Sequence, residues 1–365
     1  MQKKNTNYAK WFYLFLSLFS DWSFRIKMKI EKNISLKSYN TFGIDVKAKF
    51  FLEIYDETQL REILAENEFK PLPKLILGGG SNVLFTKDFD GLVLRISIPG
   101  IEIVDEDDKT VLIKAGAGEI WHKLVLFCVR KNFGGIENLS LIPGTVGAAP
   151  MQNIGAYGQE IKDVFENLNG VYINNGKSAI FRKDECKFAY RNSIFKNKLK
   201  NKFIITYVTL RLSKYPVINA SYGNVKSELD KLGSNHIGIK EVSDAVIKIR
   251  QSKLPDPAEI GNAGSFFRNP EVSQEKFDNL KQKFSDIVGF KLENRKVKIS
   301  AGWLIENCGW KGKKFGNTGS YVKQSLVLVN YGGATGAEVV NLAKKIKESV
   351  LDKFGIELIE EVNII

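Results

Sequence analysis

Lys74-Leu-Ile-Leu-Gly-Gly-Gly-Ser-Asn-Val-Leu84 is the stretch that decides the fold. Its first four residues form a short apolar run typical of a buried strand, and a glycine-rich turn follows. The bare backbone N–H groups of such a turn can hold a diphosphate. The turn is neither a Rossmann fingerprint, because no third glycine follows at the required interval, nor a Walker A loop, which needs Gly-Lys-Ser/Thr. By itself it is also compatible with a purely structural role.

Strands and helices are predicted on both sides of this turn. The first half of the chain is rich in runs that favour strands, and after Pro216 apolar residues recur at helical intervals. Strands are expected near 48–54, 91–97, 101–105, 110–115, 203–212 and 356–365, and helices near 119–131, 224–232, 241–251, 273–286, 300–308 and 335–354. Strands first and helices later predict an α+β protein of several domains.

Three local signals predict element boundaries. Asp56, followed three residues later by Gln59, resembles a capping box and predicts the start of a helix. The apolar runs on either side of Asn174-Asn-Gly-Lys177 predict a hairpin. Gly355, directly after the helical pattern of 335–354, predicts the end of that helix.

The composition limits the class of protein. The chain has 365 residues, of which 44% are hydrophobic and 26% charged, so collagen-like, disordered and polytopic membrane proteins are excluded. Two histidines and three widely spaced cysteines predict neither a metal site nor a disulfide scaffold. This cysteine usage suits a reducing compartment, and we expect a cytoplasmic protein.

The net charge of +13 favours anionic partners. The Lys-rich stretches 196–202 and 311–314 lack the aromatic pattern of an RNA-binding motif, so we interpret them as solvated basic loops and expect no nucleic-acid partner. Residues 1–27 carry five cations against Asp21. Their apolar run, 11–19, is shorter than the roughly 20 residues of a membrane span, so residues 1–30 are expected to be an extension without stable membrane insertion. An extension of this kind is compatible with a true start at Met28, and a weak interfacial anchor is the alternative.

Three further segments could carry chemistry. The loop 143–158, with four glycines and two prolines, is neither a regular helix nor a strand and could let a large planar ligand approach the backbone. Tyr190-Arg191 combines an aromatic ring with a guanidinium suited to a carboxylate. Ser265, flanked by glycines and by Phe266-Phe267, could project its hydroxyl into an apolar pocket, although no nearby histidine supports a hydrolase nucleophile.

Seven motifs occur in order from about residue 33 onward. They are Asn40-Thr-Phe-Gly43, Leu77-Gly-Gly-Gly-Ser-Asn-Val-Leu84, Ile142-Pro-Gly-Thr-Val-Gly147, Gln152-Asn-Ile-Gly-Ala-Tyr-Gly158, Tyr190-Arg-Asn-Ser-Ile-Phe195, Gly261-Asn-Ala-Gly-Ser-Phe-Phe267 and Ala301-Gly-Trp-Leu-Ile-Glu306. One such motif is a weak signal. The ordered set closely resembles the UDP-N-acetylenolpyruvoylglucosamine reductase family, flavoenzymes that complete UDP-N-acetylmuramate in peptidoglycan synthesis.

The resemblance implies a vanillyl-alcohol-oxidase (PCMH)-type FAD-binding fold of two subdomains and a separate α+β substrate-binding domain. The implied boundaries are 31–97 with 355–365 for the first subdomain, 98–219 for the second and 220–354 for the substrate domain. FAD is expected to bind noncovalently. The residues implied to hold it are Gly79, Gly80, Ser81, Asn82, Pro143, Gly144, Gly147, Ala148, Gln152, Asn153 and Gly155.

The resemblance also implies the reaction. NADPH delivers hydride to flavin N5, and the terminal enolpyruvyl carbon of UDP-N-acetylglucosamine enolpyruvate then takes that hydride. Arg191 and a C-terminal glutamate act at the substrate carboxylate, and Ser265 protonates the adjacent carbon. The residues implied to bind the substrate or NADPH are Tyr190, Tyr222, Lys253 and Asn269.

The identity of the C-terminal glutamate is open between two neighbours. The family reads Glu-Pro-Glu-Val where this chain reads Ile359-Glu-Glu-Val362. Motif register selects Glu361, which we prefer. Strand alternation instead favours Glu360, because it places this carboxylate among apolar residues on one face of the strand.

Two other functions are compatible with the residues. A flavin oxidase of the same superfamily would pass electrons to oxygen, and a nonenzymatic protein could bind anions. The first lacks a His or Cys in an evident flavin-attachment motif, and the second predicts a colourless protein. We expect a monomer.

Overall fold

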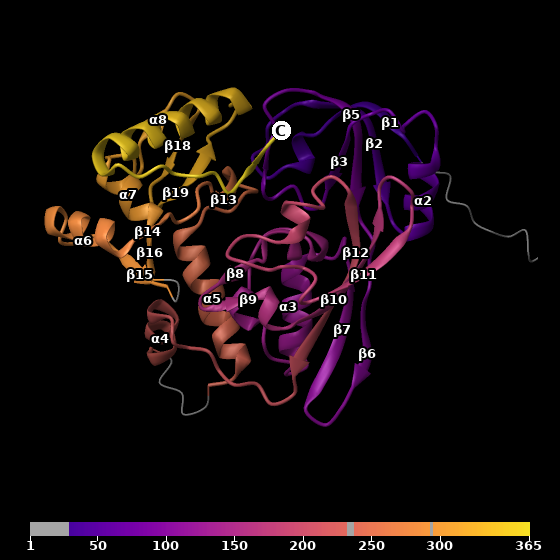
Figure 1. The fold of residues 1–365 in the computed structure, drawn as a ribbon, viewed down its shortest axis with the longest axis horizontal. Helices are drawn as coiled ribbons and strands as arrows, with labels where there is room; N and C mark the ends of the chain where they lie inside the picture. The colour runs from indigo at the N-terminus through magenta and orange to yellow at the C-terminus, as the bar shows by residue number, and fades with distance from the viewer. Residues whose placement is uncertain (1–28, 232–236, 293–294) are drawn as a thin grey trace, which may run out of the picture. The chain divides into compact units, whose positions relative to one another are not determined.

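The predicted strand Lys74–Leu77 is β3, at the edge of a four-stranded sheet (Figure 1). The strand order is β1-β2-β5-β3, with β2, β5 and β3 parallel and β1 antiparallel to β2. The strands are β1 (Glu31–Ser35), β2 (Lys47–Ile54), β3 (Lys74–Leu77) and β5 (Phe89–Ile96). Helix α2 (Glu57–Ala65) follows β2, since parallel strands need a crossover connection.

The computed structural model describes residues 29–231, 237–292 and 295–365, and residues 31–365 form one compact unit. The expected extension 1–30 therefore lies outside the described residues, except for its last two positions. None of the described helices combines the length and apolar character needed to cross a membrane.

A second sheet, of five antiparallel strands, is built from the middle of the chain. Its order is β11-β10-β12-β7-β6. The strands are β6 (Ile101–Glu106), β7 (Thr110–Gly116), β10 (Phe165–Tyr172), β11 (Ser178–Arg182) and β12 (Phe203–Ser213). Helix α3 (Trp121–Arg130) packs Leu124 and Val125 into one core with Ile113 of β7. The β10–β11 pair confirms the hairpin predicted around Asn174–Lys177.

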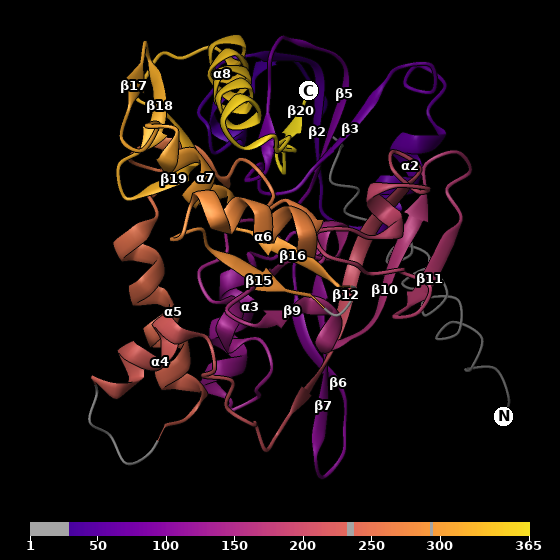
Figure 2. The same ribbon diagram turned by 60° about the vertical axis from the view of Figure 1, so that its left-hand side comes forward.

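Residues 261–354 form two smaller sheets and three helices (Figure 2). The sheet orders are β13-β19-β18-β17 and β14-β16-β15, and Figure 2 shows α6 beside β15 and β16. The bounds are β13 (Gly261–Ser265), β14 (Glu271–Ser273), β15 (Gly289–Lys291), β16 (Lys296–Ile299), β17 (Lys314–Phe315), β18 (Thr318–Tyr321), β19 (Gln324–Asn330), α6 (Gln274–Lys283), α7 (Ala301–Asn307) and α8 (Gly336–Phe354).

Two helices connect the second sheet to these smaller ones. They are α4 (Gly223–Asp230) and α5 (Ile239–Lys253), and they share a small core of their own that contains Val225 and Val246. The remaining elements are short: β4 (Val83–Leu84), β8 (Gly155–Ala156), β9 (Gln159–Glu160), β20 (Asn363–Ile364), and the 3-10 helices η1 (Lys37–Tyr39), η2 (Glu137–Leu139), η3 (Val146–Ala148), η4 (Pro150–Gln152), η5 (Ile161–Asp163) and η6 (Ile194–Lys196).

The local signals place the elements well. The Asp56 side chain accepts a hydrogen bond from the backbone N of Gln59 at 2.8 Å, as a helix cap should. The Gln59 side chain accepts from the backbone N of Tyr55, one residue before the position a regular capping box would use. Gly355 ends α8 in the left-handed conformation with φ +62°. The predicted helices and the strands before residue 213 are therefore confirmed to within a few residues, and with them the α+β class.

The predicted strand 356–365 is wrong in extent, because this segment has two successive partners. Its first part pairs with the chain after β13: Arg268 N donates to Ile359 O, and Glu361 N donates to Phe266 O. Its last part forms β20, which runs parallel to β4 after the glycine-rich turn. The change of partner leaves only Asn363–Ile364 as a regular strand.

One hydrophobic core joins parts of the chain that are far apart in sequence. Phe42, from the connection between β1 and β2, and Phe51 of β2 lie in the same buried cluster as Phe266, Leu304 of α7 and Ile346 of α8. The end of β13 is thereby held beside the sheet that carries the glycine-rich turn.

Candidate active site

Two adjoining cavities lie at the glycine-rich turn. The turn cavity, of about 180 Å³, is lined by residues 76–83, by most of the segment 142–154, and by Trp121, Lys196 and Asn363. The arginine cavity, of about 150 Å³, is lined by Ser81, Asn82, Ile142, Pro143, Gln152, Ile154, Gly155, Arg191, Arg250, Ala263, Gly264, Ser265 and Glu361. The first six residues of the second list line both cavities, so the two are direct neighbours.

Glycines let the two walls of the turn cavity approach each other. A Cβ added to Gly79 would lie 3.0 Å from Gly144 Cα, a contact so tight that the neighbouring backbone would have to shift by a few tenths of an ångström. The Ser81 hydroxyl donates to the carbonyl of Pro143 at 3.2 Å. The turn after β3 and the loop 143–158 are therefore packed directly on one another, and their backbones are open to a ligand.

Asn82 joins three segments of the chain at the boundary between the cavities. Its Nδ2 donates to Gln152 Oε1 at 2.8 Å and to the carbonyl of Glu361 at 3.4 Å. Its own carbonyl accepts from the backbone N and the side-chain Nδ2 of Asn363. The turn, the loop 143–158 and the C-terminal segment are thus fixed at one residue.

Arg191 and Glu361 face each other in the arginine cavity. Arg191 Nε lies 3.1 Å from Glu361 Oε1, and the two side chains are only 21% and 13% exposed. The contact is an ion pair without a hydrogen bond through Nε, while Nη2 of Arg191 donates to the carbonyl of Gly155 at 2.7 Å. The backbone of Arg191 is left-handed, with φ +52°, a strained conformation that recurs at functional sites.

The neighbouring Glu360 lies elsewhere. Its carboxylate accepts from Lys347 of α8 at 2.8 Å, and it does not line the arginine cavity. Residues 359–361 pair with 266–268 and not with a continuing sheet, so strand alternation alone does not decide between the two glutamates. Of the two glutamates left open by the sequence, Glu361 is the one beside Arg191.

Positive charge exceeds negative charge around Glu361. Burial raises the pKa of the Glu361 carboxyl, against the opposing effect of Arg191, Lys196 and Arg268. Burial, with a further contribution from Arg268, lowers the pKa of Lys196. Among the described residues that line the two cavities, Glu361 is the only carboxylate. The site therefore suits an anionic ligand.

Ser265 is presented to the arginine cavity at the end of β13. The register with β19 shifts between Asn262 and Ser265, and Gly264 takes φ +69° at this bulge, which leaves Ser265 exposed. The expectation of an apolar pocket is wrong, because this cavity is lined by two arginines and a carboxylate. The aromatic neighbours Phe266 and Phe267 are buried in the core instead.

Most of the residues expected to hold the cofactor are brought together. Gly79, Gly80, Ser81, Asn82, Pro143, Ala148 and Gln152 line the turn cavity, and Gly155 lines the arginine cavity. Gly144, Gly147 and Asn153 line neither. The Asn153 amide is buried and hydrogen-bonded to Glu160, to the carbonyl of Ala189 and to the N–H of Lys162. Its role is therefore to hold the conformation of the loop 143–158.

The four expected substrate residues do not line the arginine cavity. Tyr190 lies beside Asn269, and Asn269 Oδ1 accepts from the backbone N of Ala301 at the start of α7. Tyr222 caps α4 and packs edge-on against Tyr157, with ring centroids 5.6 Å apart.

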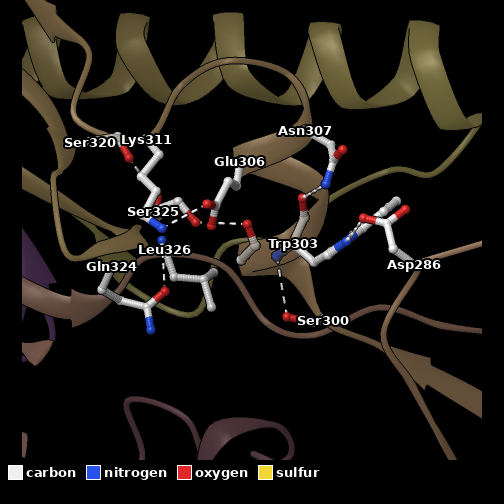
Figure 3. A network of polar contacts seen from close by, with 11 residues as sticks. Asp286, Ser300, Trp303, Glu306, Asn307, Lys311, Ser320, Gln324, Ser325 and Leu326 are labelled. Atoms are coloured by element: carbon white, nitrogen blue, oxygen red, sulfur yellow. Dashed lines mark hydrogen bonds and ion pairs between the residues drawn. The ribbon is translucent and has the colours of Figure 1, made fainter. Parts of the chain in front are cut away.

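Lys253 lines a separate cavity of about 260 Å³ beside α7 and β19. Gln324 and Ser325 of β19 share this cavity with Ser300, Gly302, Trp303 and Glu306, and Lys323 completes it. Figure 3 shows polar contacts of these two elements, such as Asn307 with Trp303 and Gln324 with Leu326. Between the elements, the Ser325 hydroxyl donates to the carbonyl of Gly302 at 2.7 Å.

Sequence reasoning missed two cations. Arg250 lines the arginine cavity from α5, where its Nε donates to the carbonyl of Leu141 and its side chain lies near Tyr157. Its position one helical turn before Lys253 was the available signal. Lys196 belongs to the stretch interpreted as a solvated basic loop, and for this residue the interpretation is wrong: its Nζ is shielded from solvent and lines the turn cavity.

Comparisons with known proteins agree with this arrangement. Residues 48–182 match the family described as "FAD binding domain", and residues 256–365 match "UDP-N-acetylenolpyruvoylglucosamine reductase, C-terminal domain". The reductases of that name from Flavobacterium johnsoniae and Amoebophilus asiaticus are 50% and 49% identical over 339 and 338 residues. Each alignment covers 93% of this chain and 100% of the relative.

The fold has a solved counterpart. The crystal structure of the Thermus caldophilus UDP-N-acetylenolpyruvylglucosamine reductase superposes with a TM-score of 0.64 at 24% identity, covering 92% of this chain and 99% of that one. The FAD-binding fold expected from the motifs is thereby confirmed. With relatives half identical to it over nearly its whole length, this chain belongs to the UDP-N-acetylenolpyruvoylglucosamine reductase family.

Proposed function

We propose that this protein is the NADPH-dependent, FAD-mediated reductase of UDP-N-acetylglucosamine enolpyruvate, and that it forms UDP-N-acetylmuramate. The observation that carries the proposal is the convergence of Arg191, Ser265 and Glu361 on one cavity that shares lining residues with the glycine-walled turn cavity. These three residues come from separate parts of the sequence, and the pairing of residues 359–361 with 266–268 brings two of those parts together.

The residues of the turn cavity fit FAD. The backbone of Gly79–Asn82 offers N–H groups suited to a diphosphate, and the shielded ammonium of Lys196 has no hydrogen-bond partner in the described part of the chain. Noncovalent binding is proposed, with Ser81, Asn82 and Gln152 as side-chain partners. When bound, FAD supplies the hydride chemistry between NADPH and the enolpyruvyl double bond.

Arg191 and Glu361 are proposed to act on the substrate carboxylate. A guanidinium that already bonds the Gly155 carbonyl is held rigidly, and it can stabilise the negative charge that hydride addition pushes onto the carboxylate and its neighbouring carbon. Burial raises the pKa of Glu361. A substrate carboxylate that enters the site would raise this pKa further and so favour a proton on Glu361, which could then be donated to the anion.

Ser265 is proposed as the proton donor to the carbon next to the carboxylate. Its hydroxyl has no hydrogen-bond partner among the described residues, so it is free to turn toward a substrate in the cavity. A serine is a weak acid, and it suits a strongly basic carbanion whose conjugate alkoxide is relieved by Arg191 or Arg250 nearby.

The nucleotide is proposed to extend away from this centre toward Lys253. Its cavity is polar and contains Gln324 and Ser325, and the Tyr190–Asn269 pair stands at the start of α7. Tyr222 is proposed to contact the same ligand after a movement of α4. The boundaries 31–97 with 355–365, 98–219 and 220–354, a monomeric state and a cytoplasmic location complete the proposal.

The test is anaerobic. The yellow holoenzyme is reduced with NADPH and then mixed with UDP-N-acetylglucosamine enolpyruvate while flavin absorbance is recorded. We expect bleaching by NADPH and full recovery of colour with the enolpyruvyl nucleotide. Failure of either step contradicts the proposal, and fast recovery with air alone points to an oxidase.

Ser265→Ala separates the two half-reactions. We expect NADPH to bleach the flavin at the normal rate and the enolpyruvyl step to slow by at least about 10²-fold, because general acid catalysis is typically worth 10²–10⁴. Ser227→Ala, which removes an exposed hydroxyl bonded only within α4, is the matched control and should leave both steps unchanged. Loss of bleaching in Ser265→Ala would contradict the assigned role.

A further inference from the structure

Lys196 is a charged group that the proposed reaction has not used. It ends η6, and the matched FAD-binding segment stops at residue 182, so Lys196 enters the turn cavity from outside that segment. Its neighbours Lys198, Lys200 and Lys202 are exposed, as a basic loop predicts. Lys196 alone among the lysines of this stretch is turned inward.

The Lys196 ammonium is held without compensation. Its Nζ is shielded from solvent and has no hydrogen-bond partner in the described residues, and no described carboxylate lies within ion-pair distance of it. Burial of an unpaired ammonium is costly unless an anion approaches it. A lysine in this state is therefore suited to a charge that arrives with a ligand.

The surrounding charges indicate at which end of the turn cavity the ligand's negative charge would lie. Lys196 lines the turn cavity together with Gln152 and Ile154, which also line the arginine cavity. The charged groups that influence its pKa include Arg268, Glu361 and Arg191, which belong to that side of the site. Arg191, Lys196 and Arg268 leave two positive charges over Glu361. A substrate carboxylate compensates one of them. The second remains for another negative charge at the same centre.

We propose that Lys196 compensates the negative charge that the bound flavin gains when it accepts two electrons and one proton, and that it thereby raises the reduction potential of the cofactor. This inference rests on the proposed function, since it requires FAD in the turn cavity. A flavin that takes up hydride carries this charge on its pyrimidine half, and a cation beside that half favours the reduced form. Lys196 is then a residue that tunes the cofactor and has no part in the proton transfer assigned to Ser265.

The test measures the flavin potential of the holoenzyme with a chemical reductant and a reference dye, without NADPH or the enolpyruvyl nucleotide. In Lys196→Gln we expect the equilibrium to shift at least tenfold toward the oxidised flavin, which is about 30 mV for a two-electron couple. Lys196→Arg keeps the charge and should stay within threefold of the unmodified protein. Lys198→Gln removes an exposed charge of the same stretch and should change nothing.

An unchanged potential in Lys196→Gln, with FAD still bound, overturns the inference. Lys196→Met serves as a second uncharged variant, and FAD occupancy is measured for each. If both uncharged variants lose oxidised FAD, the inference is also overturned, because the ammonium then faces a group that is charged in both redox states, such as the diphosphate. An unmodified protein that binds no FAD, or that NADPH does not reduce, contradicts the proposed function itself, so the two failures are distinct.

Discussion

Replacing Arg191 tests how much the buried Arg191–Glu361 ion pair contributes to the free energy of unfolding. At 3.1 Å and an effective dielectric constant of about 20, the gross attraction is about 5 kcal/mol. Much of that is offset by desolvation, but removal of one partner leaves a buried charge and typically costs about 3–5 kcal/mol. Arg191→Met also deletes the bond to the Gly155 carbonyl. We expect the free energy of unfolding to fall by about 3–5 kcal/mol at pH 7.5.

The chain offers a matched control on the second sheet. Arg211 Nε lies 2.9 Å from Glu166 Oε2, a geometry close to that of the Arg191 pair, but the two side chains are 44% and 34% exposed. Solvent screening reduces such a pair to about 1 kcal/mol or less. Urea unfolding of both variants, in excess FAD, should therefore separate them clearly. A loss below 1 kcal/mol for Arg191→Met, or an equal loss for Arg211→Met, would refute the reasoning.

The loss should also depend on pH in a defined direction. Arg191 is the largest influence that lowers the pKa of Glu361, so its removal raises this pKa further above the unfolded value. A raised folded-state pKa means that the protonated form stabilises the fold, and that this stability is lost as pH rises through that pKa. Arg191→Met should consequently be closer to the unmodified protein at pH 5 than at pH 8. The opposite trend would show that Glu361 is not the group left unpaired.

Two further predictions concern the frame around the site. Burial, with Arg250 beside it, lowers the pKa of His122, and the Nδ1 atom of His122 accepts a hydrogen bond from Leu141 N. The free energy of unfolding should therefore fall as pH drops below about 6.5, by at most about 1.4 kcal/mol per pH unit. His122→Asn should flatten that dependence in urea unfolding, and an unaltered slope would assign it to other groups. Gly80→Ala places a Cβ 2.0 Å from the Tyr39 carbonyl and should abolish soluble folded protein, whereas Gly176→Ala, with a similar φ of +67° but open space, should cost about 1–2 kcal/mol. Equal thermal stability of these two glycine variants would contradict the steric argument.

The sequence predicts the elements of this fold better than it predicts their partners. The cap at Asp56, the turn at Asn174–Lys177 and the stop at Gly355 depend on a few neighbouring residues, and all three are confirmed. The segment 356–365 was misjudged because its pairing is decided by residues 266–268 and 82–86, far away in sequence. Alternation of apolar residues carries no information on such a change of partner.

In the candidate site too, local sequence signals are predictive and contacts between distant segments are not. The family motifs identify Arg191, Ser265 and Glu361 as candidate catalytic residues, and these three residues line one cavity. Lys196 was assigned to solvent because its neighbours in sequence are lysines and asparagines, and only tertiary packing turns its ammonium inward. The sequence also does not predict the polarity of the cavity around Ser265, because the charged residues that line it come from three distant segments.

The double pairing of the C-terminal segment has a consequence for biosynthesis. Asn82 contacts Glu361 across 279 residues of sequence, so the loop that closes the site is almost as long as the folded unit itself. A nascent chain that already contains the glycine-rich turn and its sheet still lacks one wall of the cavity until Glu361 has emerged and docked. Cofactor capture should therefore follow translation of this segment, and partly synthesised chains should remain colourless even when their first two sheets have formed.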